Sequence, residues 1–161
     1  MDEWPESVER VAAFLRESGT EARLEEFREG TPTAVDAARA AGCEPGQIVK
    51  SIVLECGGRG YLALVPGDRR ADVGKVASAA GCADAVIASP ARVRELTGFE
   101  PGAVAPFPLP GIERIFMERT LLARDVVWVG AGSSRHLASI APPELARLAR
   151  AEPLDLVSGG S

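Results

Sequence analysis

Lys50 lies in the middle of an apolar segment, residues 46–54, and it is the residue of this chain best placed for chemistry. The alternation of a β-strand puts Lys50 on one face with Ile48 and Ile52, while the other face is also largely apolar. We therefore expect a strand that is covered on both sides. The chain has two lysines and sixteen arginines, so a lysine at this position is unusual in a composition that strongly favours arginine.

A buried ammonium group needs a partner, because an unpaired one is costly to bury or loses its proton. The partner of Lys50 can be a nearby carboxylate, a set of carbonyl oxygens or an anionic ligand. In a simpler arrangement the lysine stem lies along the core and its amine reaches solvent at the strand end.

A loop rich in glycine and proline, residues 98–110, is the second candidate for chemistry. Proline fixes the backbone, and a bare glycine such as Gly102 lets another group approach it closely. Such a loop can direct backbone N–H and C=O groups at a ligand. The same composition also suits an ordinary surface connection, and the sequence does not separate the two interpretations.

A glycine turn at residues 129–134 precedes His136, the only histidine. The turn lacks the spacing of a dinucleotide-binding or phosphate-binding loop, which excludes those sites. His136 is a possible general base, but the chain has no Gly-x-Ser-x-Gly nucleophile motif, so a structural histidine is the better interpretation. The three cysteines, at positions 43, 56 and 82, show no zinc spacing, and no metal or cofactor is expected.

Alternating helices and strands must position these residues, which predicts the α/β class. Capping residues and glycine stops predict helices over residues 7–16, 33–42, 72–81, 89–98 and 142–149. Strand patterns predict a hairpin over residues 48–65 and further strands at 86–87, 112–117, 126–129 and 137–140. The tail, residues 154–161, is expected to be frayed.

The composition fits a single domain, residues 1–161, with 46% hydrophobic and 25% charged residues. The net charge of −5 argues against indiscriminate coating of nucleic acid, and DNA is not an expected partner. Local arginine patches at residues 69–70 and 92–94 suit either a solvated face or an RNA contact. No apolar run predicts a membrane span or signal peptide, and the scattered cysteines suit core positions or surface thiols in a reducing cytoplasm.

Three segments together resemble the YbaK/EbsC family, free-standing relatives of the editing domain found in some prolyl-tRNA synthetases. They are residues 33–54 with Gln47-Ile48-Val49-Lys50-Ser51, residues 97–106, and residues 129–145, with Leu64–Asp68 between them. The resemblance covers roughly residues 25–150, nearly the whole chain. It implies a single α/β domain with a mixed, strongly curved, barrel-like sheet flanked by short helices.

The resemblance implies an aminoacyl-tRNA deacylase, which hydrolyses a wrongly attached amino acid from tRNA, most often tRNA for proline. A prolyl-tRNA synthetase is then a candidate partner, and the oligomeric state is left open. Lys50 and Gly102 would be the catalytic residues, and the substrate would contact Thr33, Ser51, Ala103, Pro106 and Gly132. The chain departs from the common family pattern at Ala103, where a second glycine is usual, and it has no aspartate within residues 133–139.

An aminoacyl ester is already activated, so positioning and stabilisation of the developing oxyanion by fixed donors would suffice for hydrolysis. Lys50 would contact the terminal phosphate or the ester carbonyl, and water or the substrate itself would supply the nucleophile. A non-catalytic module that senses aminoacyl-tRNA or associates with a synthetase is the alternative from another class. A small-molecule esterase acting through His136 is a weaker one.

The expected specificity is for small amino acids, with Cys or Ala favoured over correctly attached Pro. Family members related to the YbaK type tend to carry Ser or Thr after the lysine, and this chain has Ser51. Strand alternation points Ser51 away from Lys50, so its effect on the pocket is expected to be indirect. Ala103 and Val104 in the loop predict a small pocket, which excludes larger side chains sterically.

Overall fold

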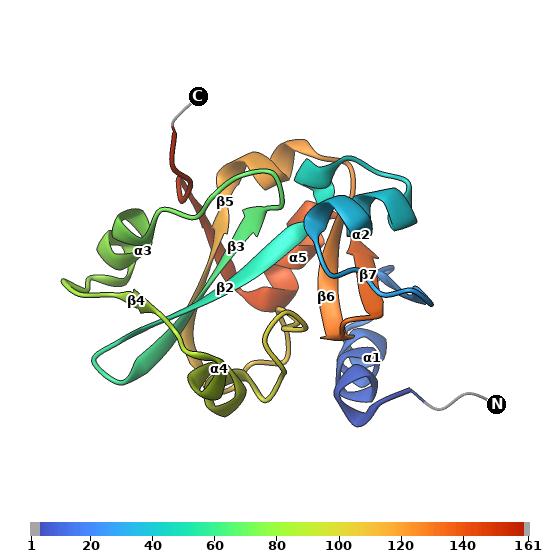
Figure 1. The fold of residues 1–161 in the computed structure, drawn as a ribbon, viewed down its shortest axis with the longest axis horizontal. Helices are drawn as coiled ribbons and strands as arrows, with labels where there is room; N and C mark the ends of the chain where they lie inside the picture. The colour runs from blue at the N-terminus through green and yellow to red at the C-terminus, as the bar shows by residue number, and fades with distance from the viewer. Residues whose placement is uncertain (1–3, 160–161) are drawn as a thin grey trace.

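The computed structural model describes residues 4–159, which form one mixed α/β arrangement of two sheets (Figure 1). The strand order is β4-β2-β3-β5-β8 in the larger sheet and β1-β7-β6 in the smaller. The helices are α1 (Glu6–Ser18), α2 (Ala34–Ala41), α3 (Val73–Ala80), α4 (Pro90–Thr97) and α5 (Pro142–Ala149), with 3₁₀ turns η1 (Pro45–Gln47) and η2 (Arg119–Ala123). The strands are β1 (Arg23–Glu26), β2 (Val49–Cys56), β3 (Arg59–Pro66), β4 (Val86–Ile87), β5 (Ile112–Glu118), β6 (Val127–Ser133), β7 (His136–Ile140) and β8 (Ala151–Leu154).

Side-chain caps and glycine stops set the bounds of three short helices. A side-chain oxygen at the N-cap accepts a hydrogen bond from the backbone N–H three residues later, which satisfies one of the free donors of the first turn. Each of these helices then ends at a glycine in the left-handed conformation, which has no Cβ penalty there. The pairs are Thr33 and Gly42 for α2, Asp72 and Gly81 for α3, and Ser89 and Gly98 for α4, as the sequence predicted.

The predicted hairpin over residues 48–65 is confirmed as β2 and β3, which pair antiparallel from Val49↔Pro66 to Cys56↔Arg59. The two turn residues, Gly57 and Gly58, both have positive φ, as a tight two-residue hairpin turn requires. Val49 and Val53 face the large core that includes α1 and β6, whereas Leu54 packs in a second core with α3. The prediction that β2 is covered on both faces is therefore confirmed.

The two sheets meet at an isolated parallel bridge between Ile48 and Trp128. Within the larger sheet β5 runs parallel to both β3 and β8, whereas β2 pairs antiparallel with both β3 and β4, so the sheet is mixed as expected. Figure 1 shows α1 and α2 around the smaller sheet, and α3 and α4 beside the larger one. The strand orders are open, ending at β4 and β8 in the larger sheet and at β1 and β6 in the smaller, and the barrel-like closure that we expected is not confirmed.

The end of the chain is packed, which corrects the expectation of a frayed tail over residues 154–161. Leu156 and Val157 are buried, and Val157 forms an isolated bridge with Ala71. The Leu156 N–H donates to the buried Glu118 carboxylate at 2.9 Å, so the segment satisfies a group that would otherwise be costly to bury. Residues 160–161 lie outside the described part of the chain.

Cys56 and Cys82 form a disulfide, so the expectation of core cysteines or surface thiols is wrong for these two. Cys56 ends β2 and Cys82 follows α3, and their sequence separation of 26 gives no sign that the two elements meet. Cys43 is the free cysteine. Within residues 4–159, no helix is both long and apolar enough to cross a membrane.

Candidate functional site

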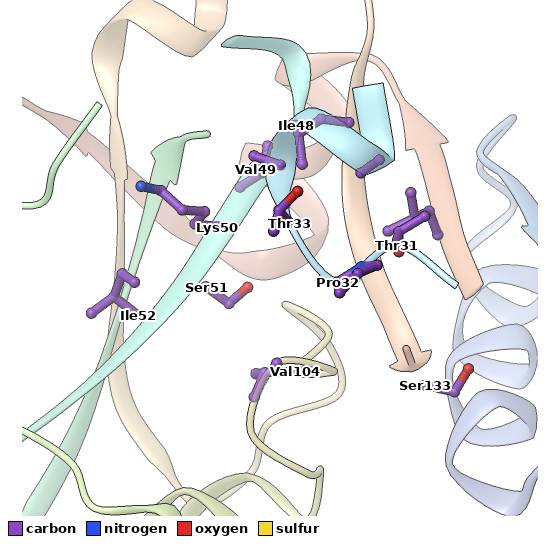
Figure 2. Close-up of a pocket in the computed structure, with 15 residues that line it drawn as sticks. Thr31, Pro32, Thr33, Ile48, Val49, Lys50, Ser51, Ile52, Val104 and Ser133 are labelled. Carbon is purple, nitrogen blue, oxygen red and sulfur yellow. The ribbon is translucent and has the colours of Figure 1, made fainter. Parts of the chain in front are cut away.

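A cavity of about 410 Å³ lies where four segments meet (Figure 2). They are the segment before α2, the first half of β2, the end of β6 and the loop rich in glycine and proline over residues 98–110, called the glycine loop below. Its wall combines apolar side chains with several hydroxyl groups, and within the described part of the chain Lys50 is its one charged lining residue. The lining residues are Thr31, Pro32, Thr33, Ala34, Ala37, Ile48, Val49, Lys50, Ser51, Ile52, Gly102, Val104, Gly130, Ser133 and Leu137.

Lys50 reaches the edge of this cavity, but its amine turns away from the centre. The Nζ atom donates a hydrogen bond to the Arg69 carbonyl oxygen at 2.6 Å. Burial lowers the pKa of Lys50, the nearby Asp68 carboxylate opposes that shift, and Arg70 adds to it. Of the partners that the sequence left open, a carbonyl oxygen and a nearby carboxylate are therefore present.

Ser51 points in the opposite direction from Lys50, into the space between Thr33 and Val104 (Figure 2). Strand alternation predicted these opposite directions, but the expectation of only an indirect effect on the pocket is wrong, because Ser51 lines the cavity. Its Oγ atom is buried and has no hydrogen-bond partner among the described residues. Leaving such a group unpaired costs about 1–3 kcal/mol, which makes the hydroxyl a candidate contact for a polar ligand.

The α2 side of the cavity is a wall of small side chains. Thr33 caps α2: its Oγ1 atom accepts from the Asp36 N–H at 3.1 Å and donates to the Asp36 carboxylate at 2.8 Å. That hydroxyl is thus already committed to the start of the helix. Ala34 and Ala37 contribute only methyl groups to the lining, so this side limits the cavity without offering further polar contacts.

The glycine loop brings Gly102 to the cavity in a left-handed conformation with φ of 82°. A Cβ atom there would meet no atom within 4 Å, so it would project into open space. The loop packs directly on β6, because a Cβ at Gly130 would lie 2.6 Å from the Val104 carbonyl oxygen. The interpretation of this loop as an ordinary surface connection therefore loses support.

Four of the seven predicted site residues, namely Thr33, Lys50, Ser51 and Gly102, line this cavity, and three do not. Ala103 is buried with 5% exposure, and Pro106 lines a different cavity. Gly132 packs β6 on α1: it accepts a hydrogen bond from the Ser7 hydroxyl at 2.6 Å. The positions of these three residues give no support to a direct contact with a ligand in this cavity.

Ser133 and His136 form a pair that the sequence did not reveal, because it spans the turn between β6 and β7. Ser133 Oγ lies 2.5 Å from His136 Nδ1 and accepts from the Arg135 N–H at 3.0 Å. The imidazole is 2% exposed, and its ring contacts Trp4 edge to face. Burial lowers the pKa of His136 and Glu26 opposes that shift, so the ring is held neutral near pH 7.

Other sequence candidates lie apart from the cavity. Arg92 pairs with Glu55 and Glu95, and Arg94 pairs with Glu100, so these two arginines are engaged in ion pairs on the protein itself. Within residues 4–159, no group of three or more His, Cys, Asp or Glu side chains is arranged to hold a metal ion.

Comparison with known proteins places these features in a family. Residues 28–148 match the model of the aminoacyl-tRNA editing domain. The matched range includes β2, which carries Lys50, and the glycine loop. The chain belongs to this family. The resemblance to YbaK/EbsC proteins seen in the sequence is thereby confirmed.

Individual relatives agree with this membership. The chain is 36% identical over 107 residues to the multifunctional Ser/Thr-tRNA deacylase ProXp-y of Escherichia coli, a match covering 62% of this chain and 61% of that protein. It is 30% identical over 132 residues to the proline–tRNA ligase of Bacillus licheniformis, covering 80% of this chain and 23% of the ligase. A crystal structure of a candidate trans-editing enzyme for prolyl tRNA synthetase superposes with a TM-score of 0.91 at 37% identity, covering 98% of this chain and all of the other.

Gly102→Val is expected to lower the rate of aminoacyl-tRNA hydrolysis, because a β-branched residue is strained at positive φ and its side chain would project beside the cavity. Ala103→Gly should be tolerated without a change in substrate range, since the Ala103 methyl is buried outside the lining. Initial rates on Ala-tRNA and Ser-tRNA, with urea unfolding as a stability control, measure both. A fully active Gly102→Val variant would return the loop to the role of a plain connection.

His136→Ala is expected to leave appreciable hydrolysis, because the imidazole does not line the cavity. Its cost should appear mainly as lost stability, since a buried ring and its bond to Ser133 are removed. Rates per folded molecule, at a temperature well below the unfolding midpoint, separate the two effects. A loss as deep as that expected for Lys50→Ala would instead indicate that His136 activates Ser133 or water, the chemistry of an esterase.

Proposed function

We propose that this protein is an aminoacyl-tRNA deacylase that removes small, wrongly attached amino acids, above all from tRNA for proline. The observation that carries the proposal is that Lys50, Ser51 and Gly102 all line one cavity in a chain of the editing family. The matched regions span about three-fifths of the E. coli deacylase and about a quarter of the ligase. The proposed activity and substrate of this chain therefore rest on its site and not on the names of these relatives.

Hydrolysis at this site would depend on positioning and on backbone donors. The Ala103 N–H already donates to the Glu100 carbonyl oxygen at 2.9 Å, whereas the Gly102 N–H has no backbone partner among residues 4–159. The Gly102 N–H is therefore the donor we assign to the ester oxygen as negative charge develops on it. Because no carboxylate or histidine among residues 4–159 lines the cavity, we assign the role of nucleophile to a water molecule or a group of the substrate itself.

Lys50 has a different task. Its amine bonds the Arg69 carbonyl on the far side of β2 from the Ser51 hydroxyl. The flexible lysine stem allows the amine to exchange that carbonyl for an anionic group of the substrate at the cavity edge. We assign it to the terminal phosphate or to the ester carbonyl, the two contacts that the sequence suggested.

The cavity offers a small amino acid one polar contact. The unpaired Ser51 hydroxyl can hydrogen-bond an amino or hydroxyl group of the substrate, opposite the methyl groups of Ala34 and Ala37. The sequence alone favoured Cys or Ala. The Ser51 hydroxyl adds Ser to that set, because a buried hydroxyl gains most from a ligand that pairs with it. Discrimination among such similar side chains is modest, about 1–3 kcal/mol, so we expect overlapping activities.

A panel of charged tRNAs tests the proposal. Initial rates are measured on Ala-, Cys-, Ser-, Thr- and Pro-charged tRNA with the purified full chain. We expect hydrolysis of several small species and little of the Pro-charged one. Rapid hydrolysis of Pro-tRNA, or none of any small species, would defeat the assignment.

A non-catalytic sensor of aminoacyl-tRNA is the second candidate. The observation that favours it is the cavity lining, in which Lys50 is the only titratable group and its amine points away from the centre. Filter binding of the same charged tRNAs distinguishes the two functions, because a sensor would retain them intact. Either function would associate the protein with the translation machinery, with a prolyl-tRNA synthetase as the candidate partner.

A further inference from the structure

A segment near the end of the chain, residues 155–158, lies across the loop that follows β3 (Figure 1). We call these residues the C-terminal strap. The strap lies outside residues 28–148, so the match to the editing-domain model does not describe its contacts. Its backbone meets the loop at three successive points, which are the Asp72 N–H with the Leu156 carbonyl oxygen at 2.8 Å, the bridge between Ala71 and Val157, and the Ser158 N–H with the Arg70 carbonyl oxygen at 2.9 Å.

The strap is anchored in the protein core. The side chains of Leu156 and Val157 are buried, and they belong to the second core together with Val76 of α3. The Leu156 N–H donates at 2.9 Å to the carboxylate of Glu118, which is also buried. A buried carboxylate is costly to leave unpaired, so this bond helps to fix the strap along the loop.

The loop that the strap holds carries the partner of the Lys50 amine. Lys50 Nζ donates to the Arg69 carbonyl oxygen at 2.6 Å, and this carbonyl belongs to the peptide group that joins Arg69 to Arg70. Ser158 contacts both of these residues. Its carbonyl oxygen accepts from the Arg69 guanidinium at 3.3 Å, and its N–H donates to the Arg70 carbonyl oxygen.

We propose that Arg69 and Ser158 are positioning residues, which hold the acceptor of the Lys50 amine in place and so keep the amine at the edge of the cavity. The inference rests on the proposed function, in which Lys50 contacts an anionic group of the substrate. A lysine stem is flexible, so the direction of its amine depends on the partner that holds it. Rates of catalysed reactions fall steeply when such a group is misplaced.

The charges around the Lys50 amine provide a readout that needs no turnover. Burial lowers the pKa of Lys50, the Asp68 carboxylate opposes that shift, and Arg70 adds to it. Asp68 and Arg70 belong to the same loop as Arg69, so a displaced loop changes both the burial and the charges that the amine experiences. Because burial is the largest of these effects, release of the loop should move the pKa of Lys50 back up toward its ordinary value.

Two variants break the contact from opposite sides. Arg69→Ala removes the guanidinium that bonds Ser158 but keeps the carbonyl oxygen that accepts from Lys50. Ser158→Pro removes the N–H that bonds the Arg70 carbonyl oxygen, without a change of charge near the amine. Arg69→Lys keeps a cationic donor that can reach the Ser158 carbonyl oxygen, so it should rescue the rate lost in Arg69→Ala.

Lys75→Ala is the matched control. Lys75 also binds the strap, through the Asp155 carboxylate and the Val157 carbonyl oxygen, but its contacts do not include residues 69–70. The substitution loosens the strap at another point and leaves the peptide group beside Lys50 in place. Urea unfolding of every variant reports how much general stability each change costs.

Two measurements on the full chain test the inference. The first is the pKa of Lys50, from carbon-13 NMR of protein labelled at the lysine ε-carbons, where the two lysines of the chain are distinguished by the Lys75→Ala spectrum. The second is the single-turnover rate on Ala-tRNA and Ser-tRNA. We expect Arg69→Ala and Ser158→Pro to lower the rate about 5- to 50-fold and to raise the pKa of Lys50. Lys75→Ala and Arg69→Lys should stay within about threefold of the wild-type rate.

The outcomes separate the inference from the function on which it rests. The inference fails if Arg69→Ala and Ser158→Pro match Lys75→Ala in both rate and pKa. It fails equally if the rate falls while the pKa of Lys50 is unchanged, because the effect then does not pass through the amine, or if the pKa moves while the rate is unchanged. Absence of any hydrolysis by the wild type would defeat the proposed function, and the pKa of Lys50 in the same variants would still decide whether the strap positions the amine.

Discussion

Replacing Lys50 by alanine is expected to lower kcat/KM for aminoacyl-tRNA hydrolysis by about 30- to 1000-fold, the equivalent of about 2–4 kcal/mol of transition-state binding. Among residues 4–159, Lys50 is the only charged residue that lines the cavity, so no other described side chain there can replace its contact with an anionic group. A loss confined to KM would assign the amine to the terminal phosphate. A loss in kcat would assign it to the ester carbonyl, where charge develops during the reaction.

The other lysine supplies the control. Lys75 pairs with Asp155 and bonds the Val157 carbonyl oxygen, and it does not line the cavity. Lys75→Ala removes the same side chain and should leave the rate unchanged. The Lys50→Ala variant should keep its fold, because the substitution removes one hydrogen bond, from the Lys50 amine to the Arg69 carbonyl oxygen. A Lys50→Ala variant that retains most of its single-turnover rate would exclude Lys50 from the mechanism.

Local signals allowed much of this fold to be predicted from the sequence. The cap at Thr33 and the stop at Gly42 act within one helix, and the Gly57-Gly58 turn fixes the hairpin register within a few residues. The alternation around Lys50 likewise predicted two covered faces and the opposite directions of Lys50 and Ser51. In each of these cases the interacting groups are close in sequence.

The features that were missed depend on contacts between distant segments. Strand β8 forms because β5 offers it a parallel edge, and its own short sequence gives no strand signal. Which face of β2 borders the cavity depends on where α2 and the glycine loop pack, so the direct role of Ser51 was not foreseen. Alternation gives two faces but does not say which one a ligand meets.

Replacing Cys56 and Cys82 together by serine is expected to lower the free energy of unfolding by about 2–4 kcal/mol. The disulfide joins residues 26 apart in sequence, and a loop of this length restricts the unfolded chain substantially. Such a loss is a large fraction of the stability of an ordinary domain, about 5–15 kcal/mol. Urea unfolding of the oxidised wild type, the reduced wild type and the double variant measures it.

The free thiol and the site provide the controls for this prediction. Cys43→Ser removes the cysteine outside the disulfide, so the unfolding of this variant should still respond to added dithiothreitol. Unfolding should become insensitive to dithiothreitol only when Cys56 and Cys82 are replaced as well. The disulfide lies at the end of β2 remote from Lys50, because Cys56 is the last residue of the strand and Lys50 the second. Hydrolysis rates well below the unfolding midpoint should therefore be the same with and without the disulfide. Equal stability of the oxidised and reduced wild type would contradict a structural role for the bond, and a rate that falls on reduction at unchanged stability would show instead that the bond acts on the site.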